Sequence, residues 1–232
     1  MAFLLNKINY LTIYGFITVL LLCSAGCKND SVVDPASNNN ISIGYFNENA
    51  AVDNTLVLTE AKFILRKIVL EGGDGGDHSD CDVKLGPFVV YLDLSQKVVI
   101  AALAKIPPGN YHEIKFQVHK LNPNESVGDP EFMESTSRRF SVIAKGTYNG
   151  ELFIFKSDIS FTKEIEFEHL PVSINEATVL NITVRLDVAS WFILDGVILD
   201  PADPDNAGII NHNIKRSFKR AFRDMNCDGD PD

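Results

Sequence analysis

The chain has 232 residues, 45% of them hydrophobic, and its 31 acidic against 21 basic residues give a formal net charge of −10. This length suits one domain of ordinary size, with enough core to fold unaided. The acidity argues against nucleic acid and anionic lipid surfaces as partners. It favours cations, in particular calcium, which takes oxygen ligands.

The N-terminal segment has the pattern of a bacterial lipoprotein signal. Lys7 precedes an apolar run over residues 11–22, and three small residues at 24–26 lead to Cys27. The run is shorter than the ~20 residues needed to span a bilayer, and it ends in small residues as secretory signals do. We therefore expect residues 1–26 to be removed and Cys27 to carry lipid. An ordinary cleaved signal and a retained anchor helix are the alternatives.

The residues after Cys27 indicate where the anchored protein resides. Lys28 stands where an Asp would resemble an inner-membrane retention signal, so we expect an outer-membrane lipoprotein that faces the periplasm or the cell surface. Residues 27–52 are predicted to be a flexible tether, because they are rich in Asn, Ser and Asp and lack a sustained period. A flexible segment of that length spans roughly 25–30 Å.

Two cysteines remain in the expected oxidising compartment. Cys81 and Cys227 are candidates for a disulfide bridge, since thiols in extracytoplasmic proteins commonly pair. A bridge over that span constrains the unfolded chain by roughly 5 kcal/mol in the loop-entropy model. Two separate thiols, or pairing with another chain, are the alternatives.

Residues 53–200 read as a series of short β-rich runs with turn residues between them. The clearest hairpin signal is Asn149-Gly150, because a type I′ turn needs positive φ at both central positions. Such spacing predicts an all-β, antiparallel β-sandwich. The expected strands cover residues 56–70, 88–94, 97–103, 112–121, 139–148, 151–155, 157–167 and 177–189.

Two stretches carry a resemblance to a family. The strand motif at residues 86–94 is followed by the turn Ile106-Pro107-Pro108-Gly109-Asn110-Tyr111, which leads into an alternating strand at residues 112–116. This arrangement resembles uncharacterised bacterial lipoprotein domains with a transthyretin-like or immunoglobulin-like β-sandwich. The resemblance covers residues 55 to 190 and supports the predicted fold. Because that family has no established activity, the resemblance implies none for this chain.

The C-terminal segment, residues 201–232, has a different texture. Ile210, Ile214, Phe218 and Phe222 recur every four residues, which predicts one apolar face of a single α-helix. The Lys and Arg residues that follow the first turn are expected on its solvated face, where they complement the C-terminal end of the helix dipole.

The last nine residues resemble the first half of a calcium loop. Oxygen-bearing side chains alternate along the chain, and Gly229 stands at the sixth position, where a sharp turn is needed. A complete EF-hand is excluded because no Glu follows at the twelfth position, so a folded calcium site needs further oxygens from the domain. A solvated acidic tail is the alternative. The expected ligands are Asp224, Asn226, Asp228, Asp230 and Asp232.

A second acidic segment at residues 72–82 combines glycines with Asp, His78 and Cys81, all potential metal ligands. No recognised ligand spacing appears, and a mobile acidic loop is the simpler interpretation. If Cys81 pairs with Cys227, this loop becomes a neighbour of the C-terminal one and is placed to complete its calcium shell.

The remaining motifs weigh against catalysis. Glu164, Glu166 and Glu168 share one strand face, which suits a solvated surface better than the opposed carboxylates of a glycosidase. Trp191-Phe192 suits core packing better than a sugar-stacking platform. We therefore expect a non-enzymatic envelope module that binds a glycan or an envelope protein, or that is structural. A glycan-binding or fimbrial-type adhesion subunit is the first alternative, and a hydrolase is the second.

Overall fold

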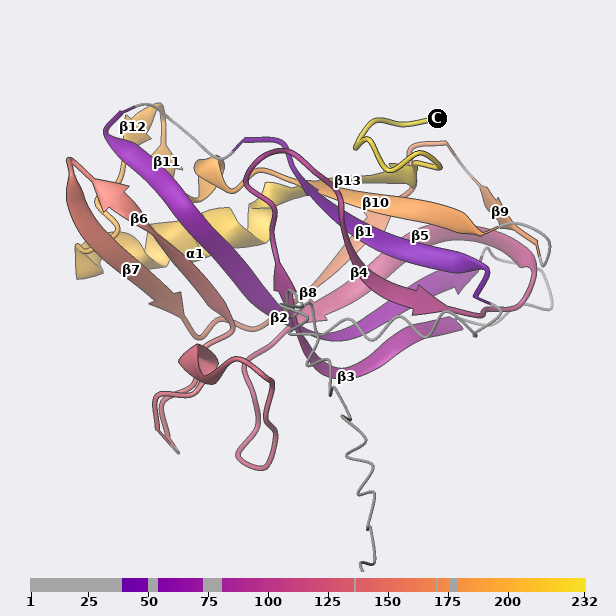
Figure 1. Ribbon diagram of the computed structural model, residues 1–232, viewed down its shortest axis with the longest axis horizontal. Coiled ribbons are helices and arrows are strands. Elements are labelled where there is room, and N and C mark those ends of the chain that lie inside the picture. Colours follow the sequence, from indigo (N-terminus) through magenta and orange to yellow (C-terminus); the bar gives the residue numbers. More distant parts are fainter. Residues whose placement is uncertain (1–38, 50–53, 73–80, 136, 170, 176–178) are drawn as a thin grey trace, which may run out of the picture.

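The computed structural model describes residues 39–49, 54–72, 81–135, 137–169, 171–175 and 179–232. Two β-sheets pack against each other and one helix lies beside them (Figure 1). The predicted all-β sandwich with a single C-terminal helix is confirmed. The signal segment, Cys27 and the first part of the tether lie outside the described residues, as does most of the acidic segment at 73–80.

The smaller sheet has four strands in the order β13-β10-β1-β4. Its pairs are antiparallel except for β1 with β10, which run parallel. The tether prediction needs a correction here, because all seven residues of β1 are buried and lie within the segment expected to be flexible. The strands are β1 (Ile41–Asn47), β4 (Val99–Ala104), β10 (Leu180–Leu186) and β13 (Phe218–Arg223).

The larger sheet is built around one long strand, β2 (Leu56–Gly72), whose ladder is wholly antiparallel. On one side β2 pairs first with β6 and then with β5, and on the other it pairs with β3. The Asn149-Gly150 turn joins β6 to β7 with φ of 51° and 84°, so the predicted hairpin is confirmed. The further strands are β3 (Cys81–Tyr91), β5 (Gly109–Val118), β6 (Val142–Tyr148), β7 (Glu151–Ser157), β8 (Phe161–Glu166) and β9 (Val172–Ile174).

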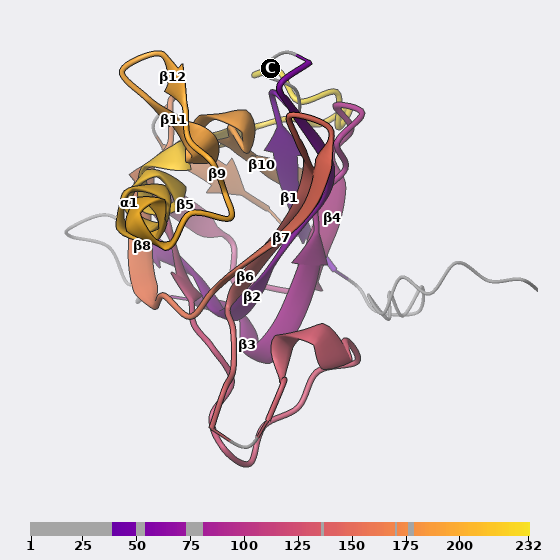
Figure 2. The same cartoon turned by 90° about the vertical axis from the view of Figure 1, so that its left-hand side faces the viewer.

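The two sheets meet along two seams (Figures 1 and 2). At the first seam a parallel bridge between Phe167 and Ala221 links the end of β8 to β13, and the Glu168 amide donates to the Ala221 carbonyl at 3.1 Å. At the second seam β3 faces β4. No strand pairing joins β3 to β4 in the described part of the chain. The sandwich is therefore closed along one side and open along the other.

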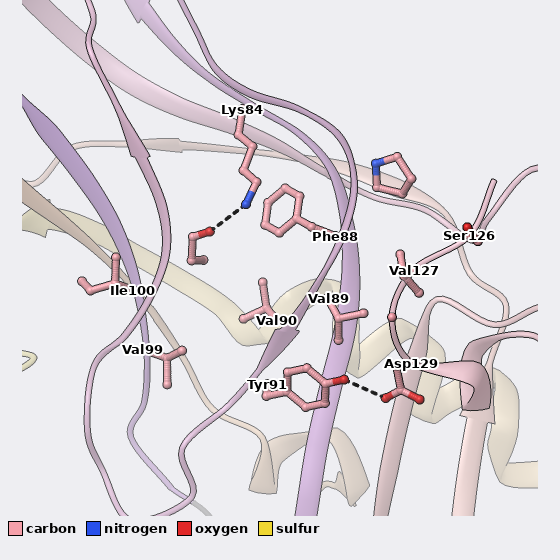
Figure 3. Close-up of a pocket in the computed structure, with 13 residues that line it drawn as sticks. Lys84, Phe88, Val89, Val90, Tyr91, Val99, Ile100, Ser126, Val127 and Asp129 are labelled. Carbon is pink, nitrogen blue, oxygen red and sulfur yellow. Dashed lines mark hydrogen bonds between the residues drawn. The ribbon is translucent and has the colours of Figure 1, made fainter. Parts of the chain in front are cut away.

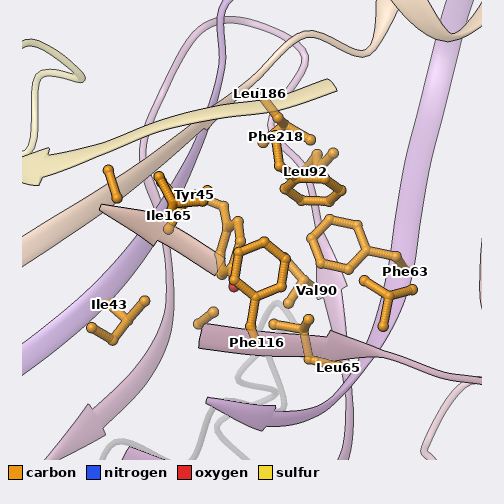
Figure 4. Packing of buried hydrophobic residues seen from close by; sticks show 14 of the residues in the cluster. Ile43, Tyr45, Phe63, Leu65, Val90, Leu92, Phe116, Ile165, Leu186 and Phe218 are labelled. Atoms are coloured by element: carbon orange, nitrogen blue, oxygen red, sulfur yellow. The ribbon is translucent and has the colours of Figure 1, made fainter. Parts of the chain in front are cut away.

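Aromatic rings fill the space between the sheets (Figure 4). Tyr45 of the smaller sheet contacts Phe63 and Phe116 of the larger sheet edge-on, at centroid distances of 5.5 and 5.9 Å. Phe218 of β13 packs on the same two phenylalanines. Such edge-to-face pairs add to the hydrophobic stabilisation of a core, and they fix the distance between the sheets.

The C-terminal helix is shorter than predicted. Helix α1 (Ala207–Ser217) buries Ile210 and Ile214 as expected, but the chain becomes β13 at Phe218. Phe218 and Phe222 are therefore strand residues beside β10, not part of the helical face. No helix in the described residues is both long and apolar enough to cross a membrane. The short elements are β11 (Ile193–Leu194), β12 (Val197–Ile198) and the 3₁₀ turns Pro130–Phe132, Ala189–Phe192 and Pro204–Asn206.

Candidate binding cleft at the open seam

The open seam holds a cavity of about 290 Å³ (Figure 3). Its walls are the edge strand β3, the facing edge of β4 and the loop at residues 126–129. The cavity extends around β3, because Phe88 and Val90 face the core while Val89 and Tyr91 face the opposite side of the strand. Most of the lining is aliphatic or aromatic. The lining residues are Lys84, Pro87, Phe88, Val89, Val90, Tyr91, Val99, Ile100, Ala101, Ser126, Val127, Gly128 and Asp129.

The register of β3 against β2 directs Lys84 and Phe88 inward. Lys84 lies opposite Ile68, and Phe88 lies opposite Leu65. Because residues directly opposite each other in an antiparallel pair share one face, Lys84 and Phe88 occupy the core-facing row of β3. The register shifts beside both positions, and Gly86 adopts φ of +91° there. Such bulges re-aim side chains.

Lys84 is the charged group at one end of the cleft. Its Nζ donates to the Ala101 carbonyl at 3.2 Å and lies 3.9 Å from the centroid of the Phe88 ring. Burial lowers the pKa of Lys84, as expected for an ammonium group moved out of water. No carboxylate of the described residues forms an ion pair with it.

At the other end of the cleft, the charged group Asp129 already has protein partners. The Tyr91 hydroxyl donates to Asp129 Oδ2 at 3.0 Å, and Lys62 Nζ donates to the same oxygen at 2.6 Å. Burial alone favours the protonated Asp129, but these donors together with the Glu131 amide outweigh it and lower the pKa of Asp129. Burial, with the Asp129 hydrogen bond, raises the pKa of Tyr91 to about 12.

Lys62 is the centre of this cluster and is only 2% exposed. It also contacts Glu131, and Glu60 lies 3.0 Å from both Lys62 and Lys145. We call Glu60, Lys62, Asp129, Glu131 and Lys145 the Lys62 cluster. A buried charge is tolerated when it is paired and hydrogen-bonded, and each member here has an opposite charge beside it.

The predicted calcium residues form an ordered loop on the outer face of the smaller sheet. Asp224 is fully buried and accepts hydrogen bonds from the Thr183 hydroxyl at 2.7 Å and from the Asp228 and Gly229 amides at 3.1 and 3.0 Å. Arg185 holds the far side of the loop, since it donates to Asp230 Oδ1 at 2.6 Å and to the Gly229 carbonyl. The loop is therefore packed on the sheet and is not a solvated tail.

The loop carboxylates turn toward neighbouring amides. Asp228 accepts from the Asp230 amide and from the Asn226 side chain, at 2.9 and 2.8 Å, and Asp232 accepts from the Met225 amide. In the part of the chain that the structure describes, no three His, Cys, Asp or Glu side chains converge as a metal would require. Calcium binding stays a prediction.

Cys81 and Cys227 are free thiols in the structure, so the expected bridge is not formed there. Cys81 begins β3 of the larger sheet, whereas Cys227 lies in the loop beyond β13 of the smaller sheet. Burial and neighbouring Asp residues raise the pKa of both thiols, which disfavours the reactive thiolate.

The three glutamates of the predicted strand face do not act together. Glu168 lies beyond β8 and pairs with Arg220, while Glu164 lies 2.9 Å from Lys115. Glu166 lies opposite Glu113 of β5. Glu164 and Glu166 therefore lie beside neighbouring positions of β5, whereas Glu168 pairs with Arg220 of β13.

Sequence reasoning missed a carboxyl pair that forms across strands. Glu71 of β2 lies opposite Glu113 of β5. Their hydrogen bond, followed by burial and the like charge, raises the pKa of Glu113 to about 7. The two are 42 positions apart in the chain, so only the strand register reveals the pair.

Trp191 and Phe192 are core residues, as the sequence favoured. Both are fully buried; Trp191 Nε1 donates to Ser217 at 2.8 Å, and Phe192 contacts the rings of Phe153 and Phe155. Neither ring is available to stack on a sugar.

Comparisons of the chain with protein-family models, curated proteins and solved structures found no match.

Proposed function

We propose that this chain is a lipid-anchored protein of the bacterial outer membrane that works without catalysis, as a binding module whose ligand occupies the cleft between β3 and β4. The observation that carries the proposal is the cavity of about 290 Å³ at the unpaired seam. Clefts that combine apolar side chains with a few polar groups are the usual form of small-ligand sites.

The chemistry of the lining favours binding over reaction. Its titratable groups are Lys84, Tyr91 and Asp129. Asp129 is neutralised by Lys62, and the raised pKa of Tyr91 keeps its hydroxyl protonated at neutral pH. Lys84 donates to a main-chain carbonyl. The three groups thus serve to hold and orient a ligand.

The lipid anchor is supported by the sequence before the described residues. The apolar run at 11–22 and the small residues at 24–26 precede Cys27 as in lipoprotein signals. Expression of the full chain with Cys27→Ser in a Gram-negative host tests this. We expect the wild-type chain to gain the mass of acyl groups and to fractionate with the outer membrane, and the variant to do neither. Equal masses after processing would refute the anchor.

The binding site is tested by filling it. A thermal-shift screen of small neutral and charged compounds is run on the wild-type chain and on Val99→Trp, which places an indole in the cleft. Val197→Trp is the matched control, because Val197 is 65% exposed on β12, outside the lining residues. We expect stabilising compounds to lose their effect with Val99→Trp and to keep it with Val197→Trp. Compounds that stabilise all three proteins equally would locate binding elsewhere.

A glycan is the alternative ligand class for the same cleft. Tyr91 is 41% exposed at its rim and Phe88 lines its wall, and aromatic rings with one exposed face suit stacking. A polysaccharide pull-down with the wild-type chain, Tyr91→Ala and the control Val197→Trp distinguishes this case. We expect the wild-type chain and the control to bind a glycan and Tyr91→Ala to lose it.

A further inference from the structure

We infer that the ligand of the seam cleft is a small carboxylic acid with an aromatic or aliphatic body, and that Lys84 binds its carboxylate. This inference rests on the proposed function and names the ligand class of the same site. It combines the position of Lys84, the imbalance of charge between the two ends of the cleft, and the size and composition of the lining.

Lys84 occupies a place where a sandwich normally puts an apolar side chain. It lies opposite Ile68 in the core-facing row of β3, and the neighbouring inward positions are Phe88 and Val90. A polar group in such a row is informative because burial of a charge is costly without a partner. Something other than packing must favour a lysine here.

The ammonium group of Lys84 has N–H donors without an acceptor among the described residues. It carries three N–H donors, and its one hydrogen bond in the described residues goes to the Ala101 carbonyl at 3.2 Å. The face of Phe88, 3.9 Å away, supplies a cation–π contact. No carboxylate of the described residues lies within ion-pair distance of it, so within that part of the chain its charge is open to an incoming anion.

The opposite end of the cleft offers an anion no free cation, because the two ammonium groups of the Lys62 cluster are shared among its three carboxylates. Asp129 is paired with Lys62 at 2.6 Å and accepts from Tyr91 at 3.0 Å. Its negative charge is therefore compensated before any ligand arrives. Lys84 is the lining cation without an acidic partner among the described residues, and it offers an anion a local site although the chain carries a net charge of −10.

The cavity sets the size of the ligand body. Its volume of about 290 Å³ is roughly twice the ~150 Å³ that accommodates benzene in an engineered protein cavity. Val90, Val99 and Ile100 form the wall beside Lys84 (Figure 3). One ring or a short aliphatic chain with a carboxylate matches this space.

The test compares phenylacetate with phenylacetamide, which has the same shape and no charge, on the full chain. Isothermal titration to about 20 mM covers the dissociation constant near 1 mM expected for a ligand of about ten non-hydrogen atoms. We expect the acid to bind about tenfold more tightly than the amide, as charge-assisted hydrogen bonds are stronger than neutral ones. Lys84→Met is expected to abolish this difference.

Lys67→Met is the matched control, because Lys67 lies on β2, pairs with Asp82 at 3.0 Å and is not part of the lining. It should retain the wild-type preference. Lys84→Gln provides a second variant if Lys84→Met folds poorly, with circular dichroism as the check of folding.

The outcomes distinguish carboxylate binding by Lys84 from ligand binding in the cleft as such. Equal binding of acid and amide by the wild-type chain, or a preference that survives Lys84→Met, would overturn the carboxylate assignment. If neutral compounds still lose binding with Val99→Trp, the cleft remains a binding site. Phenylacetate that does not bind at all, together with no compound sensitive to Val99→Trp, would overturn both.

Discussion

Two lysines at the two ends of the seam cleft have opposite environments. Lys62 is 2% exposed and is surrounded by Asp129, Glu131 and Glu60, all within 3.0 Å, whereas Lys84 has a carbonyl and a ring but no described acid. A buried charge that is paired with side chains of the same protein contributes to stability only while its partners are present. A charge left without a partner is available to a ligand. The comparison separates a structural lysine from a functional one.

The largest expected effect comes from removing the structural lysine. Lys62→Met leaves the Asp129 and Glu131 carboxylates without their shared cation, and breaking a buried pair in this way costs about 3–5 kcal/mol. We expect the melting temperature to fall by roughly 6–15 °C. Differential scanning calorimetry measures it. A fall of the same size for Lys84→Met would erase the distinction between the two lysines.

The second prediction concerns the packing of the C-terminal loop, residues 224–232, on the smaller sheet. Gly229 has φ of +89°, and a Cβ there would overlap the Phe46 ring. Gly229→Ala is expected to cost about 2–3 kcal/mol, combining backbone strain with this overlap. Gly150→Ala is the control, since Gly150 has φ of +84° with open space around its Cβ position. Its cost should be about 1 kcal/mol, and equal urea midpoints for the two variants would show that the loop does not pack on Phe46.

The third prediction tests whether the C-terminal loop binds calcium although its carboxylates already accept hydrogen bonds. We expect millimolar calcium to stabilise the full chain by about 1 kcal/mol relative to EDTA through binding to the folded state. Asp228→Asn keeps the size and one acceptor oxygen of the side chain and should abolish the shift. Magnesium is the ionic control. Identical melting curves in EDTA and calcium would leave the loop as a purely protein-stabilised structure.

The carboxyl pair of Glu71 and Glu113 gives a smaller effect with a defined sign. The pKa of Glu113 is raised to about 7 from near 4.5 in the unfolded chain, so the folded state holds the extra proton. Its contribution to stability is present below pH 4.5 and is lost as the pH rises through 7. Glu113→Gln should therefore flatten the stability profile between pH 5 and 8 and raise the melting temperature at pH 8 by about 1–2 °C. Lys115, which contacts Glu71, and Glu164 face the same pair. A wild-type profile that rises over this range would contradict the assignment.

The smallest expected change in stability belongs to the functional lysine. Lys84→Met exchanges one hydrogen bond and a cation–π contact for an apolar chain of similar length, at a cost below about 1 kcal/mol. Chemical denaturation with urea measures it beside Lys62→Met. Stabilisation by Lys84→Met would sharpen the comparison further, because functional charges are often retained at the expense of stability.

The parts of the fold that were predictable depend on neighbours in the chain. The Asn149-Gly150 turn needs only two positive φ angles and two flanking strands. Phe218 and Phe222 misled the helix prediction, because their spacing of four residues is that of one helical face. In β13 a register shift instead places Phe218 in the core and Phe222 beside Arg185 on the other face of the sheet. Pairing with β10 decides between helix and strand, and that partner lies more than 30 residues earlier.

The cleft itself was not predictable from local pattern. Lys84 appears in the sequence as one lysine of an alternating run, and its inward direction results from shifts in the register of β3 against β2. The wall that faces it comes from β4 in the other sheet. The ordered state of Asp224 likewise depends on Thr183, 41 positions away, which is why the last nine residues resembled a solvated tail as much as a site.

The position of β1 governs the order in which this molecule can fold. Its neighbours in the smaller sheet are β4 and β10, and Ile41 pairs with Leu180 in parallel. β1 has an earlier partner in β4, but the smaller sheet is complete only after β10 has paired with β1 and β13 has paired with β10. Closure of such distant segments is slow because much chain entropy is lost before the contacts form. We therefore expect the smaller sheet to be the later of the two sheets to close, because it needs residues 180–223 as well as β1.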